Sequence, residues 1–260
     1  MILLSFDIEE FDMPFEYGKD ISFQDQMEIS KKGTIIILDI LKKYHLKATF
    51  FSTVIFAKNA LELIDRIVAE GHELASHTFY HSNFEIEHLV ASKLALEQIS
   101  GQNIKGLRMP RMQDVDHVEV RNAGYSYNSS LNPTWLPGRY NNLHKPRTYF
   151  TDNGVVQIPS SVSPIVRFPL FWLSFHNLPL WLYIRAAKYT LKKDKYLNLY
   201  FHPWEFIGLN DKKRFGFPAY VSRNTGKLMQ QRMEIFISHQ LKTGVKFGTF
   251  SQFIEKAETY

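Results

Sequence analysis

The chain has 260 residues, of which 45% are hydrophobic, with 31 Lys and Arg against 26 Asp and Glu and no cysteine. This length suits one domain with a sizeable core, and the lack of cysteine excludes disulfides, zinc bound by thiolates and thiol catalysis. The net charge of +5 is modest and no nucleic-acid motif is present, so we expect no nucleic-acid partner. The first residues do not form a signal peptide, so we expect a cytoplasmic protein.

Strand-like segments alternate with helix-like ones along the chain. We expect strands at 2–6, 47–53, 72–76, 106–109, 125–129, 155–158, 197–201 and 246–249. We expect helices at 29–44, 59–70, 85–100, 116–123, 179–193, 227–242 and 251–258. This order predicts a parallel sheet with helical crossovers, in a single α/β domain over residues 1–260.

Polar residues cluster just after several of the expected strands. Those that can carry chemistry are Asp7, Glu9, His77, His81, Arg108 and His202. A β/α barrel builds its site from groups at the C-terminal ends of its strands. These residues are therefore candidates for one common site.

The most informative stretch is residues 70–81, which contains His77 and His81 with Thr78 between them. Two imidazoles four residues apart can converge on one cation if the chain turns there. Neutral imidazole is a common ligand of zinc and related metals. Thr78 occupies the position of the metalloprotease Glu, which excludes that motif. Taken alone, the pair is also compatible with two surface or capping histidines.

Five segments, in the right order, resemble the polysaccharide deacetylase (NodB homology) family of carbohydrate esterases. Residues 5–10 resemble its Thr-Phe-Asp-Asp-Gly motif, and residues 71–81 its Gly-His-Glu-x-x-Ser-His-(Ser/Thr)-x-x-His motif. Residues 108–110 match Arg-x-Pro, and 124–131 resemble Gly-Tyr-x-Tyr-Asp-Ser-Ser. Residues 199–205 resemble the late Leu-x-x-His motif, in the His-Pro-Trp-Glu form of a subgroup that also has Asp-x-Glu in its first motif.

The resemblance implies a distorted, incomplete (β/α)7-type barrel with one divalent metal ion, zinc first and other divalent transition metals as alternatives. It implies a hydrolase of carbon–nitrogen bonds that removes an N-acetyl or related acyl group from an amino sugar. The setting would be surface-polysaccharide or lipid-linked saccharide biosynthesis. Two alternatives stay open: hydrolysis of a ureide or formyl group, and a degenerate barrel that binds saccharide without turnover.

The resemblance also implies roles for the acids of the first motif. His77 and His81 correspond to metal ligands. The family's third ligand is the second Asp of that motif, and Ile8 stands in its place here. We expect Glu9 to be the third ligand and Asp7 the general base, with the reverse assignment as the alternative.

Arg108 resembles the family Arg that pairs with the base and keeps its carboxylate ionised. His202 resembles the general acid that protonates the leaving amine. Relatives orient that His with an acid at the position of Asn128, so Glu205 is the alternative partner. Ile8 and Asn128 together motivate the degenerate alternative.

We expect the substrate site to include Pro110, Asn128, Trp204 and Glu205. Trp204 and Trp135 could wall the sugar site, with core packing as the alternative for each. The expected partner is a saccharide or a lipid- or nucleotide-linked sugar.

Residues 165–184 are rich in aromatic side chains but also contain Arg167, His176, Pro169 and Pro179. These residues oppose a membrane-spanning helix. We expect the segment to cover the barrel near the site. The alternative is a surface for peripheral contact with the inner face of the membrane or with a lipid-borne substrate.

Overall fold

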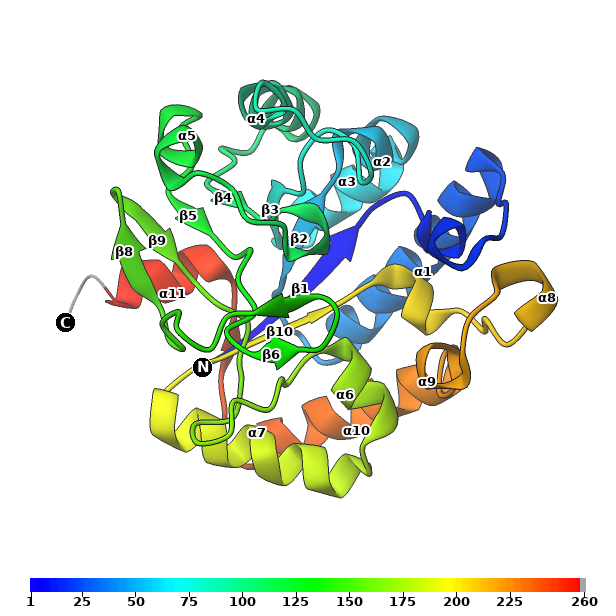
Figure 1. The fold of residues 1–260 in the computed structure, drawn as a ribbon, viewed down its shortest axis with the longest axis vertical. Coiled ribbons are helices and arrows are strands. Elements are labelled where there is room, and N and C mark those ends of the chain that lie inside the picture. The colour runs from blue at the N-terminus through cyan, green and yellow to red at the C-terminus, as the bar shows by residue number, and fades with distance from the viewer. Residues whose placement is uncertain (258–260) are drawn as a thin grey trace.

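A curled, mostly parallel sheet forms the centre of the structure, a computed structural model that describes residues 1–257 (Figure 1). The main sheet contains β1 (Ile2–Ile8), β2 (Thr49–Ser52), β3 (Glu73–Ser76), β4 (Gly106–Leu107), β5 (Tyr127–Asn128), β8 (Phe150–Asp152), β9 (Val155–Gln157), β10 (Leu197–Phe201) and β11 (Phe247–Gly248). The expected domain of 1–260 and the expected helix at 251–258 both extend beyond the described residues.

Seven parallel strands lie side by side in the order β10-β1-β2-β3-β4-β5-β9. β8 pairs antiparallel with β9, and β11 pairs with the first residues of β1. Between β9 and β10 the ladder is replaced by single bonds: the Ser161 amide donates to the carbonyl of Asn198 (2.9 Å), and the Asn198 side chain donates to the carbonyl of Ile158 (3.0 Å). The expected distorted, incomplete barrel is confirmed.

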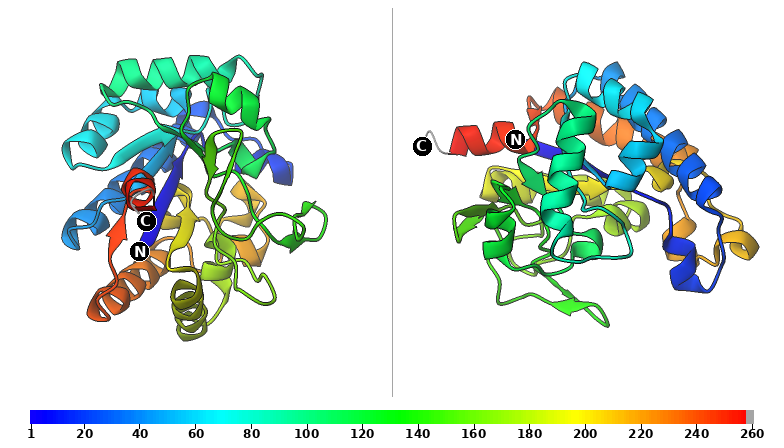
Figure 2. Two further views of the ribbon diagram at one scale, coloured as in Figure 1. Left: turned by 90° about the vertical axis from the view of Figure 1, so that its left-hand side faces the viewer. Right: turned by 90° about the horizontal axis from the view of Figure 1, so that it is seen from above.

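Helices surround the outside of this sheet, as the side views show (Figure 2). They are α1 (Phe23–Lys43), α2 (Val54–Asn59), α3 (Leu61–Ala69), α4 (His88–Ser100), α5 (His117–Asn122), α6 (Trp172–Asn177), α7 (Leu180–Asp194), α8 (Lys212–Phe215), α9 (Ala219–Ser222), α10 (Lys227–Lys242) and α11 (Phe250–Ala257). Three short 3₁₀ helices are η1 (Met13–Tyr17), η2 (Pro110–Met112) and η3 (Pro203–Phe206).

Strand β1 separates an apolar face from a polar one. Because successive side chains of a strand point to opposite faces, Leu4, Phe6 and Ile8 share one face and all join the main hydrophobic core. Ser5 and Asp7 share the other face, where both are hydrogen-bonded to Arg108. The interior of the barrel is therefore polar at the end where β1 finishes.

Gly33 allows α1 to pack tightly against η3. A Cβ atom at this position would lie 2.0 Å from the backbone oxygen of Pro203. Helix α1 begins at Phe23, earlier than expected, because the Ser22 side chain accepts a hydrogen bond from the Asp25 amide and caps the helix. This packing fixes the position of the loop that follows β10.

Several parts of the fold were not expected from the sequence, among them the short helices α2, α8 and α9. The strands β6 (Trp135–Leu136) and β7 (Tyr140–Asn141) form a separate hairpin that stands out from the body of the molecule (Figure 2). The strand β8 adds to the far edge of the sheet. The segment 165–184 is divided into a loop, α6 and the start of α7. None of the helices in residues 1–257 combines the length and apolarity that a bilayer-spanning segment needs.

Candidate metal centre and active site

The acids of the first motif reach the site because of the alternation of β1. Ile8 is fully buried in the core, while Asp7 and Glu9 lie two residues apart and both line the pocket. A carboxylate at position 8 would point into the apolar core instead. Glu9 is the next residue after Asp7 on the polar face. It thus provides the carboxylate that the family pattern places at position 8.

His77 and His81 come together through an irregular loop and not through a helix. Thr78 has a φ of 65°, which turns the chain directly after β3. Its amide donates to the Ser76 hydroxyl (3.2 Å), and its own hydroxyl donates to the carbonyl of Tyr80 (2.9 Å). These bonds hold the unusual backbone conformation, and the two imidazole rings stack 5.9 Å apart.

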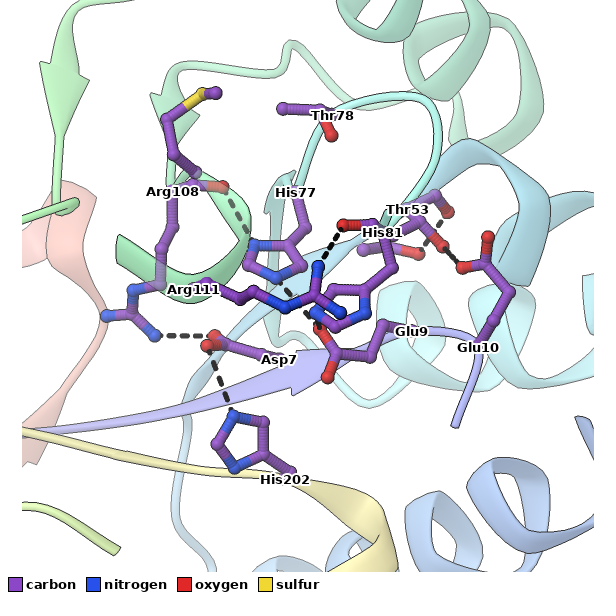
Figure 3. Close-up of polar contacts among 12 residues, drawn as sticks. Asp7, Glu9, Glu10, Thr53, His77, Thr78, His81, Arg108, Arg111 and His202 are labelled. Atoms are coloured by element: carbon purple, nitrogen blue, oxygen red, sulfur yellow. Dashed lines mark hydrogen bonds and ion pairs between the residues drawn. The ribbon is translucent and has the colours of Figure 1, made fainter. Parts of the chain in front are cut away.

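Glu9, His77 and His81 are the three residues whose possible ligand atoms converge within the described part of the chain. The Nε2 atoms of His77 and His81 lie 2.9 and 3.1 Å from the same oxygen, Glu9 Oε2 (Figure 3). This buried oxygen receives no hydrogen bond. All three side chains are at least nine-tenths buried.

The remaining imidazole nitrogens determine which atoms are free to bind a cation. His77 Nδ1 lies 2.7 Å from the carbonyl of Arg108, and His81 Nδ1 lies 2.7 Å from Asp12 Oδ1. Each Nδ1 must therefore carry a hydrogen, which leaves each Nε2 of a neutral ring as a lone-pair donor. Three electron donors then face one point, an arrangement that requires a positive charge there.

That charge can be a proton or a metal ion. Burial lowers the pKa of His81, but the carboxylates of Glu9 and Asp12 outweigh burial and raise it. Two imidazoles and one carboxylate are also a common set of ligands for zinc, with room left for water or substrate. The three residues therefore fit a mononuclear divalent metal.

A completely buried ion pair lies beside the trio. Arg108 is 0% exposed and donates to Asp7 Oδ1 (2.6 Å), to the Ser5 hydroxyl (2.9 Å) and to the Ser129 hydroxyl (3.1 Å). Burial by itself would raise the pKa of Asp7, but the charges of Arg108, His77 and His202 outweigh burial and lower it. Asp7 is consequently held as a carboxylate.

His202 faces Asp7 from β10, with its Nε2 3.9 Å from Asp7 Oδ2. The His-Pro-Trp-Glu sequence forms η3 with Pro203 at its first position, and Glu205 reaches back to the start of the turn. Glu205 Oε1 accepts from the His202 amide (2.6 Å) and lies 2.9 Å from His202 Nδ1. Burial lowers the pKa of His202, but Glu205, Glu9 and Asp7 together raise it to about 9.

Glu205 is itself fixed by a second buried histidine. His176 Nε2, from α6, lies 2.8 Å from Glu205 Oε2, and both side chains are 0% exposed. These contacts hold Glu205 as a carboxylate: burial raises its pKa, but His176 and His202 lower it. His176 also connects α6 directly to the loop that carries His202.

These groups open into a pocket of about 300 Å³. Asp7, Glu9, His77, His81 and His202 line it, and Arg108 lies behind Asp7. Additional lining residues are Met13, Glu16, Tyr17, Arg111, Met112, Asn132, Leu136, Pro137, Arg139, Tyr140, Phe171, Trp172, Leu173, Tyr200, Trp204, Tyr220 and Val221.

Of the residues expected to bind substrate, only some line the pocket. Trp204 lines the pocket and stacks on His202 at 5.4 Å. Pro110 and Asn128 are not in the pocket lining: both are buried, and the Asn128 side chain bonds to Gln157 and Ser130. Glu205 lies behind His202, where it can act on substrate only through that ring.

Trp135 is outside the pocket lining and 59% exposed, whereas its neighbour Leu136 lines the pocket. The two residues are adjacent in β6, so their side chains leave opposite faces. Trp135 therefore neither walls the pocket nor packs in the core, the two roles expected for it.

Several residues of the site had not been identified from the sequence. Asp12 is one, although it closes the acidic stretch that starts at Asp7. Trp172 differs from Asp12, because the sequence had pointed to it as part of the aromatic segment expected to cover the site; it lines the pocket, and its ring meets His202 edge-on at 5.8 Å. Asn132, Tyr140 and Tyr200 gave no signal, since single polar aromatic or amide residues are common everywhere.

The fold and the site define an incomplete α/β barrel with a candidate metal centre at the C-terminal ends of its strands. Residues 20–128 match the sequence profile of the family described as polysaccharide deacetylase. The match covers about two fifths of the chain, and over these residues the chain is similar to that family.

A chitooligosaccharide deacetylase of Bradyrhizobium sp. (strain ANU 289) is 49% identical over 45 residues, which are 17% of this chain and 20% of that protein. The chain thus spans about a fifth of the length of the first curated relatives that it matches.

Two solved structures share the fold. One is a Mycobacterium smegmatis protein assigned as a polysaccharide deacetylase (TM-score 0.65, 18% identity, 99% of this chain and 90% of that chain). The other is a family 4 acetyl xylan esterase from Clostridium thermocellum, solved in complex with a cobalt ion (TM-score 0.51, 15% identity, 96% and 88%).

Proposed function

We propose that this protein is a metal-dependent hydrolase that removes an N-acetyl or related acyl group from an amino sugar. The observation that carries the proposal is the common pocket, in which the Glu9–His77–His81 trio, the Asp7 carboxylate and the His202 imidazole face the same space. The similarity of residues 20–128 to the polysaccharide deacetylase family and the deacetylase activities named for the curated relatives support it.

Glu9, His77 and His81 would hold the divalent ion, zinc in the first place, which supplies Lewis acidity toward water and toward an acyl oxygen. Asp7 accepts the proton of the attacking water as the carbon–oxygen bond forms. Arg108 keeps Asp7 ionised and fixes its orientation through the 2.6 Å bond.

His202 supplies the second proton. Its Nδ1 faces Glu205, so its Nε2 carries a hydrogen toward Asp7 and the pocket. As the carbon–nitrogen bond breaks, His202 Nε2 gives this proton to the amine nitrogen, and the products are acetate and a free amino sugar. An amide needs this step because an amine anion is a very poor leaving group.

Two features favour a working enzyme over a degenerate saccharide-binding barrel. Ile8 is compensated by Glu9, and Asn128 is compensated by Glu205, which occupies the position of His202's carboxylate partner. We propose hydrolysis of a ureide or formyl group only as the alternative substrate chemistry, because the same groups would serve it.

The cellular setting is part of the proposal. We infer a cytoplasmic enzyme at the inner face of the membrane that acts on a lipid- or nucleotide-linked sugar in surface-polysaccharide or lipid-linked saccharide biosynthesis. The aromatic segment at 165–184 motivates this inference, since Phe171, Trp172 and Leu173 form an apolar wall of the pocket.

The test is acetate release by metal-loaded protein from N-acetylated oligosaccharides and from nucleotide- and lipid-linked N-acetyl sugars. We expect turnover that is lost after metal removal by chelation and regained with zinc. Binding of saccharide with no acetate from any of these substrates, in protein shown to contain one metal ion, would favour the non-catalytic alternative.

A further inference from the structure

Two loops beside the pocket expose large apolar side chains to an unusual degree. We call this set the rim surface: Trp135, Leu143, Ile165, Val166 and Phe168. Their exposed fractions are 59%, 47%, 80%, 76% and 39% in that order. Single exposed apolar residues need no explanation, but several on neighbouring loops indicate a contact surface.

The two loops are held together by the side chain and backbone of Arg167. Its guanidinium donates to the carbonyls of Lys145 (2.8 Å) and Pro133 (3.3 Å), and its own carbonyl accepts from the Thr134 hydroxyl (2.7 Å). Ile165 and Val166 thus stand at the tip of one loop, against the base of the β6–β7 hairpin that carries Trp135.

The rim surface adjoins the mouth of the pocket. Leu136, Pro137 and Tyr140 of the hairpin line the pocket, whereas Trp135 of the same hairpin is exposed. The hairpin stands out from the barrel in both views of Figure 2. A partner that covered the rim surface would therefore lie beside the entrance for substrate.

The charge of this region differs from that of the rest of the chain. Residues 131–170, which carry the rim surface, contain four Lys and Arg and one acid, whereas the remaining chain contains 27 Lys and Arg and 25 acids. Arg139 pairs with Glu16 at 3.4 Å, Arg147 pairs with Asp194 at 2.6 Å, and the one acid, Asp152, lies 2.7 Å from His117. Lys145 and Arg167 thus leave the loops of the rim surface with a positive charge.

We propose that the rim surface docks on a bilayer of anionic phospholipid, so that the pocket opens beside the membrane and takes an amino sugar attached to a membrane lipid. Exposed Trp, Ile and Val combined with basic residues are the composition that binds the interface of such bilayers. The choice of a lipid-borne substrate rests on the proposed function, but the docking does not. A neutral protein partner would leave the positive charge unexplained.

The experiment is sedimentation of the protein with vesicles of phosphatidylcholine alone or of equal parts phosphatidylcholine and phosphatidylglycerol. We expect binding to the anionic vesicles that weakens as salt is raised. The double variant Ile165→Ser with Val166→Ser, and Trp135→Ser separately, should lower vesicle affinity about tenfold or more, because each removes apolar area from the interface. Neither variant changes the pocket lining, so release of acetate from a soluble oligosaccharide should stay unchanged.

Trp181→Ser is the matched control. Trp181 is 62% exposed, on α7, which also carries basic residues, but it is not part of the rim surface. Loss of binding in this control with the rim variants intact would overturn the proposal, as would no binding of the wild type to anionic vesicles. Dissociation of a dimer by the rim variants, without a change in vesicle binding, would show that a second copy is the occupant instead. Vesicle binding needs no catalysis, so it remains informative even if the proposed activity fails.

Discussion

The floor and the rim of the pocket are built in opposite ways. The floor consists of Asp7, Glu9, His77, Arg108 and His202, which are buried or nearly so and leave the ends of sheet strands. The rim is larger than the rim surface defined above. It consists of a short hairpin, a loop and α6, with apolar side chains up to 80% exposed. Groups that must be placed within a fraction of an ångström belong on rigid elements, whereas loops can vary with the substrate. We therefore expect floor substitutions to affect chemistry and rim substitutions to affect what is bound.

The largest effect should come from the double variant His77→Ala with His81→Ala. It should lose the single bound divalent ion and lower kcat/KM by about a thousandfold or more, because metal chemistry supplies several kcal/mol. Metal analysis and acetate release measure the two effects. His117→Ala is the control, since His117 pairs with Asp152 outside the pocket. Retention of wild-type metal affinity by the double variant would place the metal elsewhere.

The two acids of β1 should separate metal binding from chemistry. Asp7→Asn should keep the metal and lose about a hundredfold or more in rate, the usual scale of general-base catalysis. Glu9→Gln should lose metal affinity first. The opposite pattern would reverse the assignment of base and ligand. Asp7→Asn also leaves Arg108 without its counter-charge, so metal binding is measured well below the midpoint of thermal unfolding.

A variant of Asp12 tests whether the carboxylate beside His81 strengthens metal binding. Asp12→Asn should raise the Kd for the metal about tenfold to a hundredfold, because a carboxylate on the far nitrogen orients a histidine ligand and raises its basicity. Competition with a chromogenic chelator measures this change. Glu16→Gln is the matched control, since Glu16 bonds to Arg111 and Arg139 and not to a ligand. If the two variants bound the metal equally tightly, the Asp12 carboxylate would have no specific role in metal binding.

A variant of Glu205 tests the proposed general acid, His202, through the pH dependence of kcat. The pKa of His202 is raised to about 9, so the protonated acid is fully present well below this pH and is lost as the pH rises through it. Glu205→Gln removes a raising contact and should lower the pKa of His202 by about one unit or more, which moves the alkaline limb of kcat to lower pH. Asn128→Ala should leave the limb in place, because Asn128 bonds to Gln157 and Ser130. If only the Asn128 variant shifted the alkaline limb of kcat, residue 128 and not Glu205 would be the partner of His202.

The smallest effect should come from Trp172 on the pocket wall. Trp172→Ala should raise KM severalfold, which corresponds to about 1 kcal/mol of lost apolar contact, with metal content unchanged. Trp181→Ser should change neither quantity, since Trp181 does not line the pocket. Loss of metal in the Trp172 variant would contradict the division between rim and floor.

The order of strands and helices could be predicted because their periodicity is written in neighbouring residues. Helix α10 occupies the expected residues 227–242, and strand β10 the expected residues 197–201. The hairpin β6–β7 and strand β8 were missed because their residues are exposed or half-buried, so no buried apolar run marks them, whereas the equally short β4 and β5 are buried. Helix α6 was missed because its six residues are too few to show a helical period.

The sequence by itself determined which residues end the strands, and so which side chains could share a site. Asp7, Glu9, His77, His81, Arg108 and His202 were all identified in this way, since parallel strands bring their C-terminal ends to one edge.

Only the tertiary structure decided the partners of these residues. It placed Glu205 on His202 where family precedent pointed to position 128, and it placed Asp12 on His81, a residue 69 positions away. The reason is physical: local patterns record which way a side chain leaves its strand, whereas hydrogen-bond partners depend on how distant segments pack.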